Sequence, residues 1–251
     1  MRSALIGHTG FIGGNLKDQF AFTHFYNSSN IAEIRNETFD LIVCGGVTAV
    51  KWWANKNPEE DRSRIDVLID NLRTTRADRI VVLSSVDVYP VVSGVDESFD
   101  CASLPNHAYG TNRLYFENAV KSHFNNTVIA RISGVFGPGL KKNVIYDLIH
   151  DNCLDAINPN SSFQYYDVKN LWNDLQVLVS GGVTLANLVT EPVRTADVVS
   201  AIFPGKQVGA ACGPEAHYDI RTRYGTLFNR PDGYLRTSDE VLAGLASFVR
   251  S

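Results

Sequence analysis

The stretch "SALIGHTGFIGG", residues 3–14, decides the fold class of this chain. Its short apolar run is typical of a buried parallel strand, and a helical pattern begins at Phe11. Between them, Gly7 allows a sharp turn, Gly10 lets a pyrophosphate approach the backbone, and Gly13 lets the helix pack closely. Glycines alone also mark ordinary turns. Their place between a strand and a helix favours a dinucleotide-binding turn.

Outward from this turn, apolar runs and helical patterns alternate. Expected strands are 23–29, 39–46, 78–85, 127–133 and 183–189. Expected helices are 11–20, 57–76, 107–124, 143–152, 168–180, 194–203 and 237–250. This alternation predicts an α/β fold, a Rossmann-like doubly wound parallel sheet with a small C-terminal substrate lobe. We expect the Rossmann core to comprise 1–135 plus about 165–205, and the lobe about 136–164 and 206–251, as a single integrated unit.

The composition is that of an ordinary globular protein. The 251 residues are 44% hydrophobic and 20% charged, with a formal net charge of −4, so neither a nucleic acid nor a membrane is an expected partner. No signal peptide or apolar run of membrane length is visible, which favours a cytoplasmic protein. Cys44, Cys101, Cys153 and Cys212 form no CxxC motif. We expect them to be reduced and packed, and we expect no metal site.

The second expected strand bears on which dinucleotide binds. NAD sites usually place an acid at the end of this strand to hold the ribose hydroxyls. Here the strand runs into "NSSN", residues 27–30, which contains no acid. Small residues such as Ser29 leave room for a 2′-phosphate, although the nearest arginine is Arg35. The cofactor is therefore NADP or NAD, with a slight preference for NADP.

Four segments carry a family resemblance. They are "GHTGFIGGNL" (7–16), "VVLSSVDVYP" (81–90), "YGTNRLYFE" (109–117) and "RISGVFGPG" (131–139). In this order they resemble the extended short-chain dehydrogenase/reductase family, the NAD-dependent epimerase/dehydratase group that acts on nucleotide sugars. The resemblance covers the first 140 residues well and the remainder loosely.

The resemblance implies a Ser–Tyr–Lys active site, with Ser85 as the serine and Tyr109 as the tyrosine. Arg113 occupies the lysine position, which departs from the family pattern. The resemblance also implies a set of cofactor-binding positions in the glycine turn and at the strand ends. These are Gly7, Thr9, Gly10, Phe11, Ile12, Gly13, Ser29, Cys44, Gly45, Gly46, Ser84, Tyr109, Arg113 and Ile132.

The chemistry assigns a role to each member of the site. A nearby cation favours the phenolate of Tyr109, which exchanges a proton with a substrate oxygen while hydride moves to or from the nicotinamide. Ser85 donates a hydrogen bond to the same oxygen. Arg113 keeps the positive charge of a lysine but is longer and planar. Catalysis could persist, the protein could bind the cofactor without turnover, or both side chains could be surface residues.

Two neighbouring residues have alternative interpretations. Asp87 is either a second acid or base beside the substrate, as in relatives that dehydrate or epimerise, or a residue that caps a turn. His107 is either a second proton carrier or the first residue of the helix.

The sequence therefore predicts an NAD(P)-dependent oxidoreductase or epimerase that acts on a sugar or a nucleotide sugar, by 4-keto reduction or epimerisation. The alternatives are a weak or inactive NAD(P)-binding sensor or scaffold, and a reductase of a non-sugar carbonyl. The resemblance also suggests a homodimer.

Overall fold

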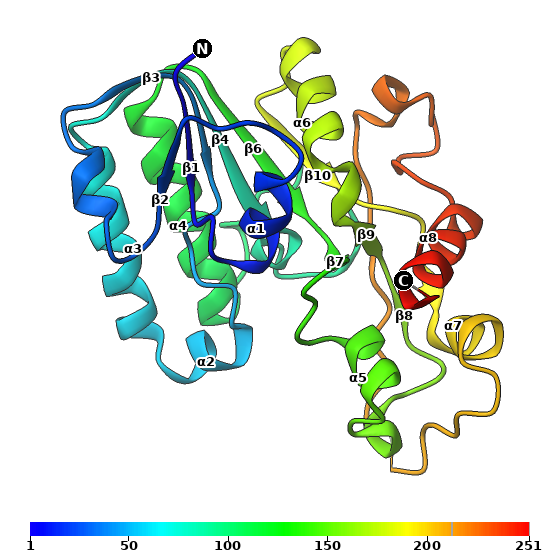
Figure 1. Ribbon diagram of the computed structural model, residues 1–251. Helices are drawn as coiled ribbons and strands as arrows, with labels where there is room; N and C mark the ends of the chain where they lie inside the picture. The colour runs from blue at the N-terminus through cyan, green and yellow to red at the C-terminus, as the bar shows by residue number, and fades with distance from the viewer. Residues whose placement is uncertain (212, 251) are drawn as a thin grey trace. The chain divides into compact units, whose positions relative to one another are not determined.

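Within residues 1–211 and 213–250, which this computed structural model describes, the largest sheet has six strands (Figure 1). Their order is β10-β6-β4-β3-β1-β2. The bounds are β1 (Ser3–Ile6), β2 (His24–Tyr26), β3 (Thr38–Cys44), β4 (Arg76–Ser85), β6 (Thr127–Ile132) and β10 (Leu185–Leu188). The expected strands are all present, and the prediction of a Rossmann-like parallel sheet is confirmed.

The order of the strands reverses beside β1, which has β2 on one side and β3 on the other, both parallel to it. Strand β3 in turn pairs in parallel with β4. In open α/β sheets, ligands bind outside the carboxyl ends of the strands at such a reversal. The glycine turn follows β1 directly and therefore lies at this point.

The glycine turn has the geometry that its sequence predicts. Gly7 has a φ of +86°, and its N–H donates to the carbonyl of Tyr26 at 2.7 Å. A Cβ on Gly7 would overlap the backbone of Gly45, and a Cβ on Gly13 would overlap the carbonyl of Gly7. The turn thus packs against its own helix and against the loop after β3 too closely for any side chain at these two positions.

Helices cover both faces of this sheet, and Figure 1 shows α3 and α4 on one side of the strands and α1 on the other. The helix α3 begins at Pro58 after an N-cap at Asn57 and carries acids in its first turn, as expected. The helix α2 was not predicted. The bounds are α1 (Phe11–Lys17), α2 (Lys51–Lys56), α3 (Pro58–Leu72), α4 (Ala108–His123) and α6 (Leu171–Ser180), with short 3₁₀ helices η1 (Ile31–Ile34), η2 (Val86–Val88) and η4 (Val168–Asn170).

The chain divides into two compact units. Unit 1 comprises Met1–Pro90, Ser98–Arg131 and Leu171–Ala186, and unit 2 comprises Val91–Glu97, Ile132–Asn170 and Asn187–Ser251. The expected core also included 91–97, 132–135, 165–170 and 187–205, which this division places in unit 2. Cys212 and Ser251 lie outside the described residues.

Unit 2 contains short strands and three helices in its described part. The strands pair as β11 with β8, β12 with β5, and β7 with β9. Helix α7 buries Val198 in the same apolar cluster as Leu245 of α8, which explains why α7 belongs to this unit. The bounds are β5 (Ser93–Val95), β7 (Gly134–Phe136), α5 (Val144–His150), η3 (Leu154–Ala156), β8 (Ser162–Phe163), β9 (Tyr165–Asp167), β11 (Val193–Arg194), α7 (Thr195–Ile202), β12 (Asp219–Ile220), η5 (Gly225–Phe228) and α8 (Ser238–Arg250).

Candidate functional site

The residues expected to bind the dinucleotide follow the carboxyl ends of the parallel strands. The glycine turn follows β1, Ser29 follows β2, and Gly45 and Gly46 follow β3. The loops after β1 and β3 are tied together, since the N–H of Gly45 donates to the carbonyl of Ile6 at 2.9 Å. The first helical hydrogen bond of α1 runs from the N–H of Gly14 to Gly10, so the N–H groups of residues 11–13 precede the helical ladder. Such groups fit a pyrophosphate.

Three of the expected cofactor-binding residues are placed differently from the rest. The side chain of Cys44 is buried in the core of unit 1, and burial raises the pKa of its thiol to about 11. The hydroxyl of Ser84 donates to the Glu117 carboxylate at 2.5 Å. Ile132 ends β6 but belongs to unit 2. Cys44 and Ser84 therefore support the site from within the fold.

The loop after β2 is closed by its own side chains. Asn27 accepts from both the N–H and the hydroxyl of Ser29, at 2.8 and 2.6 Å. Arg35 donates to Asn71 of α3 at 2.7 Å and is thus engaged away from this loop. The loop offers small polar groups for a ribose or its 2′ substituent, and the choice between NAD and NADP stays a prediction.

Ser85, Tyr109 and Arg113 come together at the end of β4 and the start of α4. The guanidinium carbon of Arg113 lies 4.2 Å from the centroid of the Tyr109 ring. Tyr109 and Arg113 are 6% and 4% exposed, so the interpretation of both as surface residues is wrong. Gly110 lets the start of α4 pack against the loop after β4, because a Cβ there would overlap the carbonyl of Asp87.

The electrostatic surroundings of Tyr109 raise its pKa above the ordinary value. Burial is the main cause, because it penalises the phenolate. Arg113 opposes this by its charge, the charge of Asp87 raises the pKa further, and hydrogen bonding from Arg113 and Ser85 lowers it. The phenol of Tyr109 is therefore neutral at pH 7.

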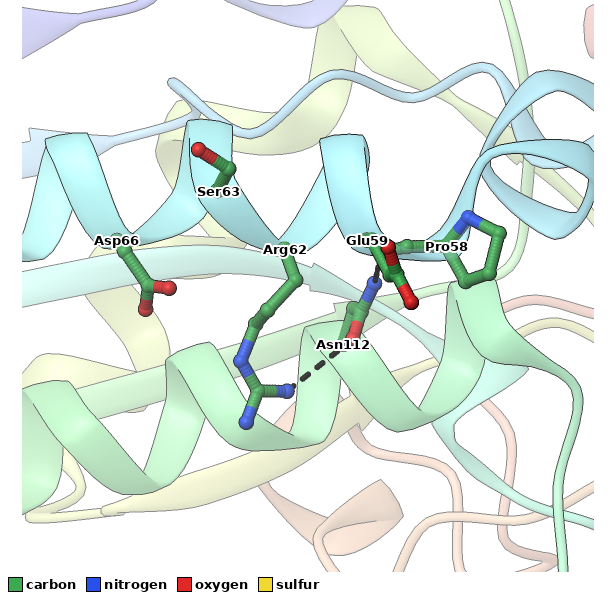
Figure 2. A pocket seen from close by; sticks show the side chains of 6 residues that line it. All are labelled: Pro58, Glu59, Arg62, Ser63, Asp66 and Asn112. Carbon is green, nitrogen blue, oxygen red and sulfur yellow. Dashed lines mark hydrogen bonds between the residues drawn. The ribbon is translucent and has the colours of Figure 1, made fainter.

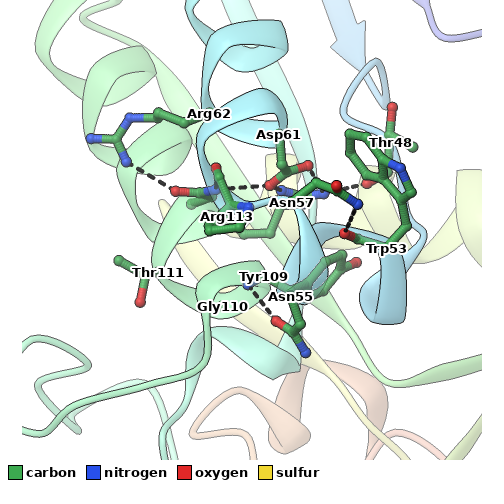
Figure 3. Close-up of polar contacts among 12 residues, drawn as sticks. Thr48, Trp53, Asn55, Asn57, Asp61, Arg62, Tyr109, Gly110, Thr111 and Arg113 are labelled. Atoms are coloured by element: carbon green, nitrogen blue, oxygen red, sulfur yellow. Dashed lines mark hydrogen bonds and ion pairs between the residues drawn. The ribbon is translucent and has the colours of Figure 1, made fainter.

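Asp61 of α3, which no sequence motif marks, holds the guanidinium of Arg113 (Figure 3). The two terminal nitrogens of Arg113 donate to the two carboxylate oxygens at 2.7 and 3.1 Å, and one of them also donates to the carbonyl of Thr48. Asn112 donates to the same carboxylate at 2.9 Å. Asp61 is 1% exposed. The only sequence signal for this contact is an acid in the first turn of α3, which also suits the helix dipole.

Asp87 forms an ion pair with a second residue that the sequence did not reveal, Lys51, at 2.7 Å. Lys51 is the first residue of α2. The N–H of Asp87 donates to the hydroxyl of Ser85 at 3.1 Å, which fixes the loop. The structure thus places this carboxylate near Tyr109, and its catalytic role stays a prediction.

The start of α4 is held by three side chains. His107 is the N-cap and accepts from the N–H of Gly110 at 3.0 Å, which agrees with the interpretation of a helix-start residue. Asn55 of α2 accepts from the N–H of Tyr109 at 2.9 Å (Figure 3). Asn106 donates to the carbonyl of Asp87 at 3.0 Å. These bonds fix the position of Tyr109 in the first turn of α4.

A second buried ion pair lies one turn further along α4. The carboxylate of Glu117 accepts a hydrogen bond of 2.7 Å from the guanidinium of Arg131 of β6, and both side chains are almost completely buried. The guanidinium also contacts the sulfur of Cys101 at 3.4 Å. Burial alone would lower the pKa of Arg131, but the hydrogen bonds and charge of Glu117 raise it above its ordinary value. Since Glu117 also accepts from Ser84, this pair connects α4 to the strand that carries Ser85.

A pocket of about 360 Å³ lies on the surface formed by α3 and α4 (Figure 2). Arg62 and Asn112 line it and are joined by a hydrogen bond of 3.1 Å. None of the expected catalytic residues lines this pocket. The pocket is therefore separate from the candidate site.

The described part of the chain also bears on the expectations about metal ligands, membrane-spanning helices and cysteines. Over residues 1–211 and 213–250, no group of three or more His, Cys, Asp or Glu side chains gathers as a metal site would require. In the same ranges, no helix has the length and apolar character to cross a membrane. Cys44 and Cys101 are buried as expected, but Cys153 is exposed, so the expectation that it is packed is wrong.

Comparisons with known proteins agree with this fold. Residues 22–156 match the model of the NAD dependent epimerase/dehydratase family, a range that begins after the glycine turn. A UDP-glucose 4-epimerase of Thermotoga maritima, solved with UDP-glucose, superposes with a TM-score of 0.77 at 12% identity, over 100% of this chain and 98% of that one. No curated protein sequence is similar enough to count as a match.

Two further solved structures are similar to the same extent. A dTDP-4-dehydrorhamnose reductase of Yersinia enterocolitica has a TM-score of 0.75 at 15% identity, over 100% of this chain and 99% of that one. The protein RMD of Pseudomonas aeruginosa, solved with NADPH, has a TM-score of 0.74 at 15% identity, over 99% of this chain and 97% of that one. At these identities the likeness shows a common fold.

Proposed function

Because the chain belongs to the NAD dependent epimerase/dehydratase family, we propose that it binds a nicotinamide dinucleotide and catalyses redox chemistry on a sugar or a nucleotide sugar, by 4-keto reduction or epimerisation. The observation that carries the proposal is the convergence of Ser85, Tyr109 and Arg113, with the guanidinium carbon 4.2 Å from the phenol ring. The bound dinucleotide supplies or accepts the hydride.

The chain's own residues divide the remaining work. Tyr109 gives a proton to, or takes one from, the substrate oxygen. Ser85 donates a hydrogen bond to that oxygen and holds it beside the phenol. The glycine turn holds the pyrophosphate through its backbone N–H groups, which the absence of side chains at Gly7 and Gly13 makes possible.

Several finer points belong to the same proposal. NADP is slightly preferred to NAD, because no acid stands at the end of β2. Unit 2 is then the substrate-binding lobe, and the protein works in the cytoplasm as a homodimer. Titration with each dinucleotide and gel filtration of the purified chain test the cofactor and the oligomeric state.

A protein that binds the dinucleotide without turnover is the second candidate. The observation that favours it is the buried ion pair of Arg113 with Asp61, which weakens the positive charge beside Tyr109. The two candidates share the cofactor site and differ only in whether the cofactor is consumed.

The test is a comparison of Tyr109→Phe with Tyr115→Phe. Tyr115 lies on the same helix and donates to Asp66 of α3 at 2.8 Å, outside the candidate site. With NADPH or NADH and a panel of 4-keto nucleotide sugars, the wild-type protein is expected to oxidise the cofactor. Y109F is expected to lose about 10²–10⁴ in kcat with unchanged cofactor affinity, while Y115F keeps its activity. Tight cofactor binding with no turnover on any substrate would favour the second candidate.

A further inference from the structure

The cation beside Tyr109 is fully paired. Both terminal nitrogens of Arg113 donate to Asp61, in the two-point geometry that arginine and carboxylate favour. The pair is buried between α3 and α4, with Asn112 as a further donor to the carboxylate (Figure 3). Arg113 still lowers the pKa of Tyr109 by its charge, and the paired carboxylate of Asp61 reduces the net positive charge that the phenol experiences.

Other charged or titratable side chains surround the start of α4. Asp87, from the loop after β4, forms its ion pair with Lys51 of α2. His107, at the start of α4, has a pKa lowered first by burial and then by the charge of Lys51. Arg62 of α3 donates to Asn112 and lies over the ring of Tyr115. The phenol thus lies beside two ion pairs and a histidine whose pKa is lowered, while Arg62 keeps its positive charge over the ring of Tyr115.

We propose that Asp61 is a positioning residue that holds Arg113 as a neutral pair and so keeps Tyr109 protonated between turnovers, which makes this site a proton donor to a carbonyl group. The proposal rests on the proposed function and sharpens it to a reductase. Tyr109 gives its proton to the carbonyl oxygen while the carbonyl carbon accepts hydride from the reduced dinucleotide, which is oxidised. The phenolate then recovers a proton from solvent.

The geometry of the stack supports this direction of transfer. The guanidinium carbon lies over the face of the Tyr109 ring, where a cation is attracted to the neutral phenol as well as to the phenolate. Arg113 also hydrogen-bonds the phenol and lowers the pKa of Tyr109, but burial outweighs this and keeps the pKa above its ordinary value. The pair with Asp61 fixes the guanidinium at the face.

The experiment is a spectroscopic titration of Tyr109 in the full-length protein, taken as the difference between each variant and the same variant with Tyr109→Phe. In the wild type, Tyr109 is expected to ionise above the ordinary value of about 10. In Asp61→Asn, which keeps the shape but removes the counter-charge, we expect ionisation to begin at least about one pH unit lower, a tenfold change in the ionisation constant. Asp66→Asn, on the same helix but bonded to Tyr115, is the matched control and should leave the titration unchanged.

Two results would overturn the proposal: a wild-type phenol that ionises below about pH 10, or an unchanged titration in D61N. If D61N does not fold, the double variant Asp61→Asn/Arg113→Gln removes both charges together. It is then expected to titrate like the wild type, and a downward shift of a full pH unit would contradict the role of the pair.

The titration needs no turnover, so its failure can be told apart from the failure of the proposed function. If the protein is inactive but the pKa of Tyr109 is high, the proposed enzymatic function is refuted, while the proposed effect of the Asp61–Arg113 pair on Tyr109 is not. For an active protein, the pH profile of reduction should extend to a higher pH in the wild type than in D61N. An equal profile in the two proteins would contradict the proposal.

Discussion

Helix α4 takes part in two buried arginine–carboxylate pairs, one turn apart, and they differ in which partner the helix supplies. At Arg113 the helix supplies the cation and α3 supplies Asp61. At Glu117 the helix supplies the carboxylate and β6 supplies Arg131. The difference lies in what remains if the helix residue is lost. Asp61 can take up a proton and become neutral, whereas an arginine cannot release one. Loss of the helix residue therefore leaves a group that can become neutral in the first pair, but a permanent buried charge in the second pair, which joins the helix to the sheet.

Removal of Glu117 is expected to have the largest effect on stability. In Glu117→Ala the guanidinium of Arg131 stays buried but loses its carboxylate partner. The sulfur of Cys101 and the ring of Tyr89 remain in contact with it. We expect a loss of about 5 kcal/mol in the free energy of unfolding, at the upper end for a broken buried pair. Denaturant unfolding measures it. The control is Glu60→Ala, which breaks an exposed pair with Arg64 and should cost no more than about 1 kcal/mol. An equally small loss in E117A would show that the Glu117–Arg131 pair does not stabilise the fold.

Removal of Arg113 is expected to cost less and to depend on pH. Arg113→Met leaves Asp61 with Asn112 as a donor, and we expect a loss of about 3 kcal/mol near neutral pH. Burial disfavours an unpaired carboxylate over the neutral acid, so the loss should shrink as the pH falls. Unfolding measured across acid and neutral pH tests this. A loss that equals that of E117A and does not vary with pH would remove the distinction between the two pairs.

The smallest effect is expected at the N-terminus of the same helix. Burial and the charge of Lys51 lower the pKa of His107 below its unfolded value. The unfolded state therefore binds the proton more readily, and stability that is present above about pH 6.5 should be lost as the pH falls through the folded pKa. His107→Asn keeps a good N-cap without titration in this range. Comparison of unfolding at mildly acid and neutral pH should show a smaller slope in H107N, and an equal slope would exclude His107 as the cause.

Most of the fold could be predicted because its signals are local. The apolar run before Gly7 and the Asn57–Pro58 start of α3 are sequence patterns with a direct backbone meaning, and both are present as predicted. Helix α2 was missed because it has six residues and only Ala54 is buried, so it lacks an apolar face. The unit to which α7 belongs has no local signal, because it depends on the apolar cluster in which Val198 packs.

The candidate site could be predicted only in part. Ser85 and Tyr109 were found from motifs, and the structure brings them together with Arg113. Asp61 and Lys51 were not found, since each reaches its partner across at least 36 residues. Their types are common on helix surfaces, and their spacing carries no signal. Only the packing of α2 and α3 against α4 reveals them.

By itself, the sequence determined the order of strands and helices, the glycine turn, and the presence of an arginine where the family resemblance implies a lysine. These follow from backbone preferences and from the spacing of apolar residues along the chain. The tertiary structure alone decided what that arginine does. A charge acts through space on whatever lies within a few ångströms, and the residues at that distance, Asp61 and the ring of Tyr109, come from separate helices that meet only when the chain is folded.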